Sequence, residues 1–358
     1  MKTKCLSLII VGLMLCFAAC KKSNLAANKS VDVYVAGSIV TANNKIEAAY
    51  WKNGTIVKLA DSLSFSSTYG IGVLGTDVYV VGYISTPDFS TTNAVYWKNG
   101  VATKLDNVSN NSQANGIAFQ GTDMYVVGSV YNNALQSFQA TLWKNGVATV
   151  LTGGSTANAI AISGTDVYVA GVSGTGNNIA ATYWKNGIAA KLTGGLQANA
   201  IAINGTDLYV GGNMTGGAAG YWKNGVATTL TNAGVANQSA YEVTGIATNG
   251  TDVYVTGSTF FTSAADAQNA NSWGSLATFW KNNTPATIPA NPLNNMAAAV
   301  YIYGPDVYIV NEGVNNGPDS FVASYWKNGT IVPLSTGGSK GAYPGSIVVA
   351  ADNRIVYH

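Results

Sequence analysis

The chain has 358 residues, of which 47% are hydrophobic and only 9% are charged, and its formal net charge is +2. The apolar content excludes a disordered chain, and the near balance of charges excludes the basic surface that binds nucleic acid. Low charge combined with 41 glycines and 20 tyrosines is typical of an all-β protein with many turns.

The first twenty residues are predicted to be a targeting segment. Two lysines precede an apolar run from Leu6 to Phe17, which is too short to span a membrane. The next stretch, Phe17-Ala18-Ala19-Cys20, resembles the lipobox of bacterial lipoproteins. The resemblance implies that residues 1–19 are removed, that Cys20 is lipidated, and that residues 20–30 tether the protein to a membrane of the cell envelope, in our interpretation the outer membrane. An ordinary secretory signal is the alternative.

Two short motifs repeat along the rest of the chain, and the aspartate of the second one recurs at intervals of 41 to 54 residues. This period is typical of four-stranded propeller blades. The first motif is Tyr-Trp-Lys-Asn-Gly or a near-copy, with its tryptophan at Trp51, Trp97, Trp143, Trp184, Trp222, Trp280 and Trp326. The second is Gly-Thr-Asp-Val-Tyr-Val or a variant, with its aspartate at Asp32, Asp77, Asp123, Asp166, Asp207, Asp252 and Asp306.

Each period contains the pattern of four short strands. In the third unit an Asn-Gly dipeptide between two apolar runs is a strong hairpin signal, because both central residues of a type I′ turn need positive φ. Tyr and Trp are neighbours on one strand, so both faces of that strand are covered, as in a stacked blade. The strands expected in this unit are Gly116–Phe119, Met124–Val127, Ala140–Lys144 and Val147–Leu151.

Seven repeats predict an all-β, seven-bladed β-propeller of four-stranded antiparallel blades within residues 31–358. No first strand precedes Asp32, whereas Ser346 to Ala350 resembles one, so the C-terminal strand is expected to complete the N-terminal blade. A further strand-like stretch, Arg354 to Tyr357, is surplus and could displace a strand, pack on an edge or begin an eighth blade. An open solenoid is the structural alternative.

The order of elements resembles the kelch type of β-propeller and related bacterial propeller repeats. The matching residues are Leu208-Tyr209-Val210-Gly211-Gly212, a strand ending in a double glycine, followed by Trp222. The resemblance implies an architecture that serves mostly as a binding scaffold and sometimes as an enzyme. It carries no catalytic residue over to this chain.

The repeated residues are interpreted as structural. The tryptophans should pack between blades, and the turn geometry puts the repeated aspartates on the same face as the repeated lysines, a face that we call the turn face. We expect Asp–Lys pairs there rather than calcium sites, because the lysines would repel a cation. No metal or other cofactor is expected. The lysines are Lys52, Lys98, Lys144, Lys185, Lys223, Lys281 and Lys327.

The opposite face, which we call the loop face, carries the connections that do not repeat, and binding residues usually lie on such loops. Phe260, Phe261 and Trp273 in the longest insertion could instead pack that insertion against its own blade. The candidate ligand-binding residues are Tyr83, Phe89, Tyr131, Tyr241, Glu242, Trp273, Glu312 and Tyr343.

Signatures of catalysis are scarce. The only histidine is His358, so a catalytic triad is excluded. A glycosidase would need two facing carboxylates, for which Glu242 with Glu312 or Asp266 with Asp319 are the available pairs. The sequence therefore favours a monomeric, lipid-anchored envelope propeller that binds a glycan or a protein through its loop face. A glycosidase-like enzyme and a purely structural assembly subunit remain as alternatives.

Overall fold

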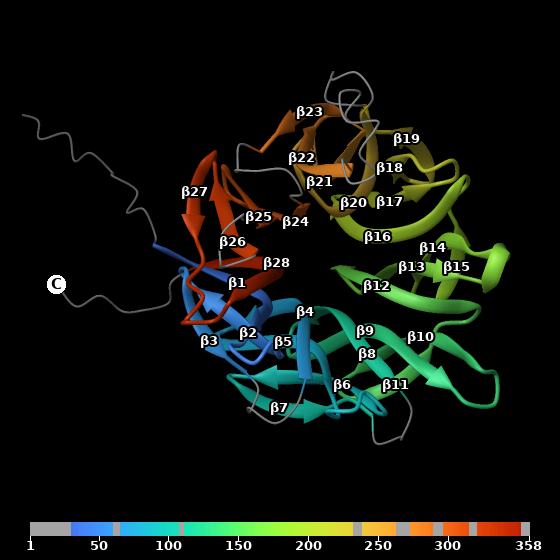
Figure 1. Ribbon diagram of the computed structural model, residues 1–358. Helices are drawn as coiled ribbons and strands as arrows, with labels where there is room; N and C mark the ends of the chain where they lie inside the picture. The colour runs from blue at the N-terminus through green and yellow to red at the C-terminus, as the bar shows by residue number, and fades with distance from the viewer. Residues whose placement is uncertain are drawn as a thin grey trace, which may run out of the picture.

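Seven blades of four antiparallel strands each are arranged around a central axis, which makes the protein a seven-bladed β-propeller (Figure 1). The last and first blades are also joined by one parallel pair, Phe321 with Gly341. The computed structural model describes residues 30–59, 65–106, 111–231, 238–262, 273–288, 296–314 and 321–351. The fold predicted from the two repeated motifs is confirmed.

The blades are numbered in chain order, and the strands of each blade are given in their order from the central axis to the rim. Blade 1 consists of β28 (Gly341–Ala351), β1 (Val31–Val40), β2 (Ile46–Lys52) and β3 (Thr55–Lys58). Blade 2 consists of β4 (Phe65–Leu74), β5 (Asp77–Ser85), β6 (Thr92–Lys98) and β7 (Val101–Lys104). Blade 3 consists of β8 (Ser112–Gln120), β9 (Asp123–Asn132), β10 (Ser137–Lys144) and β11 (Val147–Val150). Blade 4 consists of β12 (Gly154–Ser163), β13 (Asp166–Ser173), β14 (Ala180–Lys185) and β15 (Ile188–Lys191), with the short 3₁₀ turn η1 (Gly176–Asn178) before β14.

The last three blades follow the same plan. Blade 5 consists of β16 (Gly195–Asn204), β17 (Asp207–Met214), β18 (Ala219–Lys223) and β19 (Val226–Thr229). Blade 6 consists of β20 (Gln238–Asn249), β21 (Asp252–Thr262), β22 (Trp273–Lys281) and β23 (Thr284–Thr287). Blade 7 consists of β24 (Met296–Tyr303), β25 (Asp306–Val314), β26 (Phe321–Lys327) and β27 (Thr330–Pro333).

The ring is closed by strands from opposite ends of the described chain. β28 pairs antiparallel with β1 from Val31 opposite Ala351 to Val40 opposite Gly341. The innermost strand of every blade also contacts that of the next blade, including β24 with β28 and β28 with β4. The predicted closure is therefore confirmed, and the surplus stretch Arg354 to Tyr357 lies outside the described residues.

The core is divided into seven layers between neighbouring blades, and each layer contains one repeated tryptophan. Trp184 of blade 4 is fully buried and packs with Ala140 and Leu151 of blade 3. Its indole Nε1 donates a hydrogen bond to the Thr152 carbonyl at 3.2 Å. The tryptophans therefore fill the space between blades, as the sequence predicts, and Trp184 also ties two blades together through a hydrogen bond.

The turn face carries one polar module per blade, which is well illustrated by blade 4. Lys185 Nζ lies 2.7 Å from Asp166 Oδ2 and 5.2 Å from the centre of the Tyr168 ring. Asn186 donates from Nδ2 to Asp166 Oδ1 and accepts the Val167 N–H on Oδ1, both at 2.8 Å. Lys185 and Asn186 hold the pKa of Asp166 below its usual range. The asparagine has φ of 50°, as a type I′ turn requires.

The predicted Asp–Lys pairs are present in all seven blades, with Nζ to Oδ2 distances of 2.7 to 2.9 Å. In each pair the lysine also lies 5.1 to 5.5 Å from the centre of a tyrosine ring. The sequence did not predict the tyrosine contact. A carboxylate with an aromatic ring is therefore the recurring way in which this protein holds an ammonium group.

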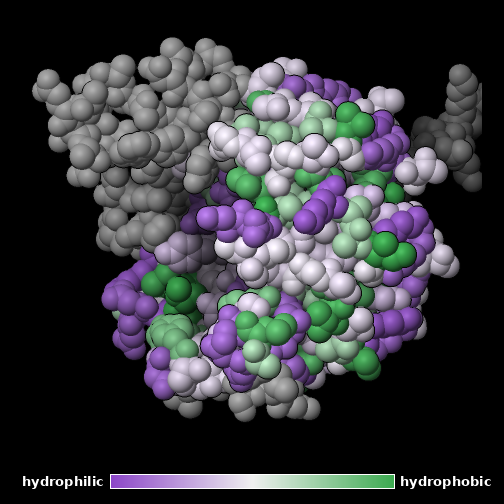
Figure 2. Space-filling view, turned by 90° about the vertical axis from the view of Figure 1, so that its right-hand side faces the viewer, coloured by the Kyte–Doolittle hydropathy of each residue, from purple (hydrophilic) through white to green (hydrophobic). Residues whose placement is uncertain are grey.

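The rim is formed by the short fourth strands. Their first residues include the exposed apolar side chains Val101, Val147, Ile188 and Val226. Figure 2 shows apolar residues on one side of the rim as small patches separated by polar ones. Within the described residues, no helix has the length and apolar character needed to cross a membrane.

Candidate functional site

At one equivalent place in the innermost strand of every blade, a residue is left out of the pairing with the second strand; blades 4, 5 and 6 have a second such residue nearer the start of the strand, at Ser155, Leu196 and Tyr241. In blade 2, for example, Thr68 is opposite Gly82 and Gly70 is opposite Val81, so Tyr69 forms a β-bulge. A bulge changes the direction of a side chain, and here all seven bulge residues line the central channel. They are Tyr69, Asn115, Asn158, Asn199, Thr244, Ala298 and Gly345.

Four of these bulge residues connect their blade to the next one. Each donates a side-chain hydrogen bond to the carbonyl of the residue that precedes the next bulge residue. The bonds run from Asn115 to Ala157 at 2.9 Å, from Asn158 to Ala198 at 2.9 Å, from Asn199 to Val243 at 3.0 Å, and from Thr244 to Ala297. We call these bonds the channel latches.

The bulge residues of three consecutive blades, blades 7, 1 and 2, form no channel latch. Ala298 of blade 7 and Gly345 of blade 1 have no donor in their side chains. Tyr69 of blade 2 is directed toward its own blade, since its hydroxyl interacts with Ser67 and Tyr83. The loop-face mouth of the channel is therefore built differently over blades 7, 1 and 2.

A pocket of about 430 Å³ opens at this place. It lies on the loop-face side of the bulge residues, and it is lined by residues of blades 7, 1 and 2 together with Thr244 of blade 6. Its lining consists of Ser38, Ile46, Ser67, Thr68, Tyr69, Tyr83, Thr244, Met296, Ala298, Glu312, Tyr343, Pro344 and Gly345. We call it the mouth pocket.

The pairing of strands explains which side chains reach the mouth pocket. Residues directly opposite each other on an antiparallel pair point to the same face of the sheet. Just above the bulge, Met296 is opposite Glu312 in blade 7, Tyr343 is opposite Ser38 in blade 1, and Ser67 is opposite Tyr83 in blade 2. All six line the mouth pocket.

Blade 7 departs from the repeat next to its carboxyl group. The other six blades have glycine opposite the residue before the bulge, and a Cβ there would lie about 2 Å from a carbonyl oxygen, for example 1.9 Å from Ser67 O at Gly82. Blade 7 has Asn311 at this position, followed by Glu312. The carboxyl is therefore a feature of one blade only.

Burial dominates the electrostatics of Glu312. It raises the pKa of the half-buried carboxyl from 4.5 to about 7. Among the described residues, no hydrogen bond or ion pair reaches this carboxyl. The charge of Glu312 contributes, after burial, to the raised pKa of Tyr343. The two groups are therefore close enough to interact within the mouth pocket.

Tyr69 and Tyr83 form an aromatic pair at the blade 2 side of the mouth pocket. Their ring centroids are 6.0 Å apart and the rings are tilted by 33°. Burial, followed by the nearby Tyr83, raises the pKa of Tyr69 to about 12. Both phenols therefore stay neutral at physiological pH and offer ring faces and hydroxyl groups to a ligand.

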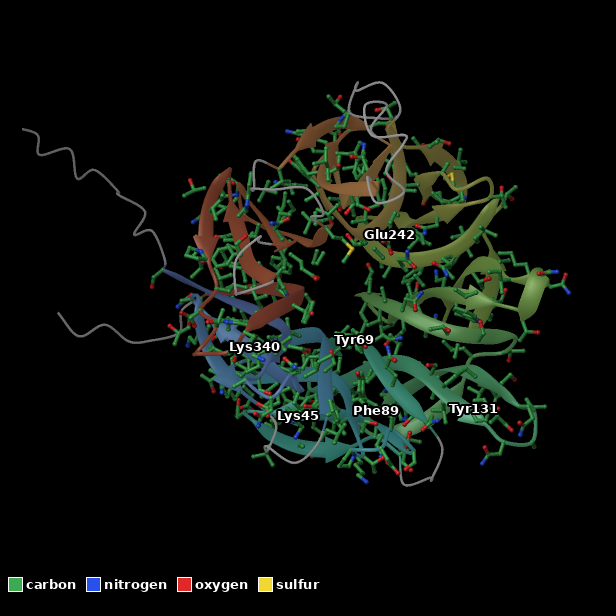
Figure 3. The ribbon with its side chains drawn as sticks, in the orientation of Figure 1. Lys45, Tyr69, Phe89, Tyr131, Glu242 and Lys340 are labelled. Atoms are coloured by element: carbon green, nitrogen blue, oxygen red, sulfur yellow. The ribbon has the colours of Figure 1, made fainter. Side chains whose placement is uncertain are left out.

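The structure brings three of the eight candidate residues together, namely Tyr83, Glu312 and Tyr343. Glu242 is half-buried on β20 in blade 6 and does not line the mouth pocket. Figure 3 shows Tyr69 and Glu242 near the central opening and Phe89 and Tyr131 farther out. Phe89 contacts Phe65 at 4.5 Å between ring centroids, and Tyr131 contacts Phe138 at 5.2 Å.

All of the candidates except Phe89 lie on strands rather than on loops. The strands extend farther toward the loop face than the sequence suggests, and even Trp273 begins β22, opposite Thr262. The side chains of Tyr241 and Trp273 lie outside the described residues, as do Asp266, Asp319 and Cys20.

The sequence reasoning missed Tyr69, Met296 and the two serines of the mouth pocket. A signal for Tyr69 was present, because three of the innermost strands have asparagine before a small residue and isoleucine, as in Asn115-Gly116-Ile117. Blade 2 has Tyr69-Gly70-Ile71 at this place. Tyr69 therefore departs from a pattern that three consecutive blades share.

The structure does not bring the carboxyl groups of Glu242 and Glu312 together as a close pair. Burial alone raises the pKa of each group, and neither carboxyl contributes to the pKa of the other. Glu312 is the one carboxyl group in the lining of the mouth pocket. No group of three potential metal ligands occurs in the described part of the chain.

No protein-family model matches the chain, and neither does any curated protein. Its fold is similar to the β-propeller domain of the trilobed protease from Pyrococcus furiosus, with a TM-score of 0.50 and 10% identity over 85% of this chain and 92% of that one. An acylaminoacyl peptidase bound to Z-Gly-Gly-Phe-chloromethyl ketone has a TM-score of 0.48 at 13% identity. The Pyrococcus horikoshii acylaminoacyl peptidase has a TM-score of 0.46 at 12% identity. Each of these two matches covers 86% of this chain and 51% of the peptidase chain. At such low identity, the similarity concerns the fold alone.

Proposed function

We propose that the protein is a lipid-anchored binding module of the bacterial cell envelope, with a kelch-like repeat, whose mouth pocket receives part of a glycan or protein ligand. The observation that supports this proposal is that the bulge residues of blades 7, 1 and 2 form no channel latch. Four blades use their bulge residues to hold one another, while blades 7, 1 and 2 leave a pocket lined by the non-repeated residues Tyr69, Tyr83, Glu312 and Tyr343. Non-repeated side chains on a rigid repeated scaffold are typical of binding sites.

The position of β1 agrees with a tether at Cys20. β1 starts at the turn face, since Asp32 belongs to the first Asp–Lys pair. A tether of residues 20–30 would therefore hold the turn face toward the membrane and leave the mouth pocket directed away from it. Mass analysis of the mature N-terminus tests the anchor, and an unmodified peptide without Cys20 would contradict it.

The pocket is tested by binding screens with glycans and with peptides, followed by substitutions. Tyr83→Ala and Tyr343→Ala should each weaken binding at least tenfold, because each removes an aromatic wall of the pocket. Tyr131→Ala is the matched control, since this tyrosine lies on a strand end outside the pocket. Unchanged affinity in both pocket variants, with normal melting temperatures, would show that the ligand binds elsewhere.

A catalytic role is not favoured. The raised pKa of Glu312 suits a general acid, but hydrolysis of a glycoside also needs a second carboxylate at a defined distance. The described lining of the mouth pocket contains no such group.

A further inference from the structure

The mouth pocket has an unusual balance of polar groups. Among the described residues of its lining, Glu312 is the only one with a charged side chain, and no lysine or arginine accompanies it. Several hydroxyl groups in the lining are already used within the protein. Ser38 and Ser67 are bonded to each other at 2.7 Å, and Thr68 Oγ1 donates to the Gly37 carbonyl at 2.7 Å. The described lining therefore has one acidic group and no basic group, which favours a cationic ligand over an anionic one.

The missing latches add further acceptors. In the latched blades, the carbonyl before each bulge residue accepts a bond from the neighbouring blade. The corresponding carbonyls here are those of Pro344 and Thr68, and the neighbouring bulge residues Ala298 and Gly345 have no donor to give them. A Cβ at Gly345 would lie 3.7 Å from the Thr68 carbonyl oxygen, so this oxygen faces the place of the missing side chain.

The turn face shows that a carboxylate and a tyrosine ring together can hold an ammonium group in this protein. In each blade a lysine ammonium lies 2.7 to 2.9 Å from a carboxylate oxygen and 5.1 to 5.5 Å from the centre of a tyrosine ring. The described lining of the mouth pocket has a carboxyl group and three tyrosines, but no lysine. It therefore contains the same two kinds of side chain that hold an ammonium group on the turn face.

We propose that the mouth pocket binds an alkylammonium group, held by the Glu312 carboxylate and the ring faces of Tyr69, Tyr83 and Tyr343. The ammonium N–H groups find acceptors in the carboxylate and in the unlatched carbonyls, and the rings attract the positive charge. A lysine side chain of a protein and the amine of an amino sugar both carry this group. This inference depends on the proposed function in one respect, which is that both assign ligand binding to the mouth pocket.

Binding is coupled to a proton. In the empty pocket Glu312 has a pKa of about 7, so at pH 5.5 it is protonated and must release its proton to pair with a cation. The affinity therefore rises as the pH increases toward about 7 and levels off above it. The other titratable groups of the lining are the three tyrosines, whose pKa values burial raises above 10, while Glu242 of blade 6 lies outside the lining.

The experiment is calorimetric titration of the protein with two amines, Nα-acetyl-lysine amide and glucosamine, and with their N-acetylated neutral counterparts. We expect one amine to bind at least tenfold more tightly than its neutral counterpart, and at least tenfold more tightly at pH 7 than at pH 5.5; pH 7 is the upper value because the amine of glucosamine loses its own proton in weakly alkaline solution. Tighter binding of the lysine probe assigns a protein ligand, and tighter binding of glucosamine assigns a glycan.

The Glu312→Gln variant should lose at least tenfold in affinity and lose the pH dependence, whereas Glu242→Gln should behave like the unchanged protein. The proposal is overturned if neither amine binds, if the neutral counterparts bind equally well, or if Glu312→Gln keeps its affinity. Where neutral glycans or peptides bind and Tyr83→Ala abolishes that binding, the ammonium proposal fails while the mouth pocket keeps its function.

Discussion

Replacing Glu312 by glutamine should change how the stability of the protein depends on pH. The folded protein has a pKa of about 7 at this carboxyl, against 4.5 for an ordinary glutamate. Between these values the folded state keeps a proton that the unfolded chain has lost. The contribution of Glu312 to the free energy of unfolding therefore falls as the pH rises from about 4.5 to about 7, and then stays level.

The magnitude follows from the size of the pKa difference. One pH unit is worth about 1.4 kcal/mol, so the full difference corresponds to roughly 3 kcal/mol, and partial exposure of the carboxyl to water reduces this to about 1 to 3 kcal/mol. Glutamine resembles the protonated carboxyl and does not ionise. The Glu312→Gln variant should therefore match the natural protein at pH 4.5 and exceed its stability by this amount at pH 8.

Urea unfolding of both proteins at the two pH values measures the difference. The chain contains only three glutamates, Glu47, Glu242 and Glu312, so carboxyl ¹³C NMR can follow the titration directly, with the variant assigning the signal. Asp88→Asn serves as a control, because hydrogen bonds from Thr86 and Ser90 lower the pKa of Asp88 to about 2, and its contribution is constant over this pH range. A Glu312 midpoint near 4.5 would refute the reasoning.

Four further changes test the scaffold. Trp184→Ala should lower the free energy of unfolding by about 3 to 5 kcal/mol, because it empties a packed interblade layer; a loss below about 1 kcal/mol in urea unfolding would contradict this. Gly171→Ala should sharply reduce the yield of folded protein, since its Cβ would lie 2.0 Å from the Thr156 carbonyl oxygen; a normal yield and circular dichroism spectrum would show that the strand can move. Asn186→Ala should cost about 1 to 2 kcal/mol and Asn186→Gly less, because alanine is strained at positive φ; equal melting temperatures for the two variants would remove the argument from φ. Removing β28 should open the ring, and a truncated monomer with unchanged thermal stability in light scattering and calorimetry would show that closure is dispensable.

The architecture could be predicted from the sequence because the same physical task recurs in every blade. Each blade needs one large side chain in the interblade space, one tight turn that starts with an asparagine and one Asp–Lys pair, so Trp184, Asn186 and Asp166 have counterparts in every blade. Ring closure was also predictable, because a first strand was missing at one end of the chain and Ser346 to Ala350 supplied one at the other.

The candidate site was predictable only in part. Tyr83, Glu312 and Tyr343 stand out because they break the repeat, but the mouth pocket depends on the β-bulges, whose positions no single residue type marks. The bulge residues range from Gly345 to Tyr69, since what they share is a place in the ladder rather than a side chain. Phe89 and Tyr131 also break the repeat, yet they lie apart from the pocket, which pattern alone could not show.

The pairing of β1 with β28 sets a limit on how the molecule is made. A chain is synthesised from its N-terminus, so β1 is available long before its inner partner, and the pairing joins strands from opposite ends of the described chain. Until β28 arrives, the inner edge of β1 has unpaired N–H and C=O groups that can accept a strand from another molecule. Before β28 is made, this edge is therefore open to pairing between molecules, and a chaperone that covers the edge of β1 would act at that stage.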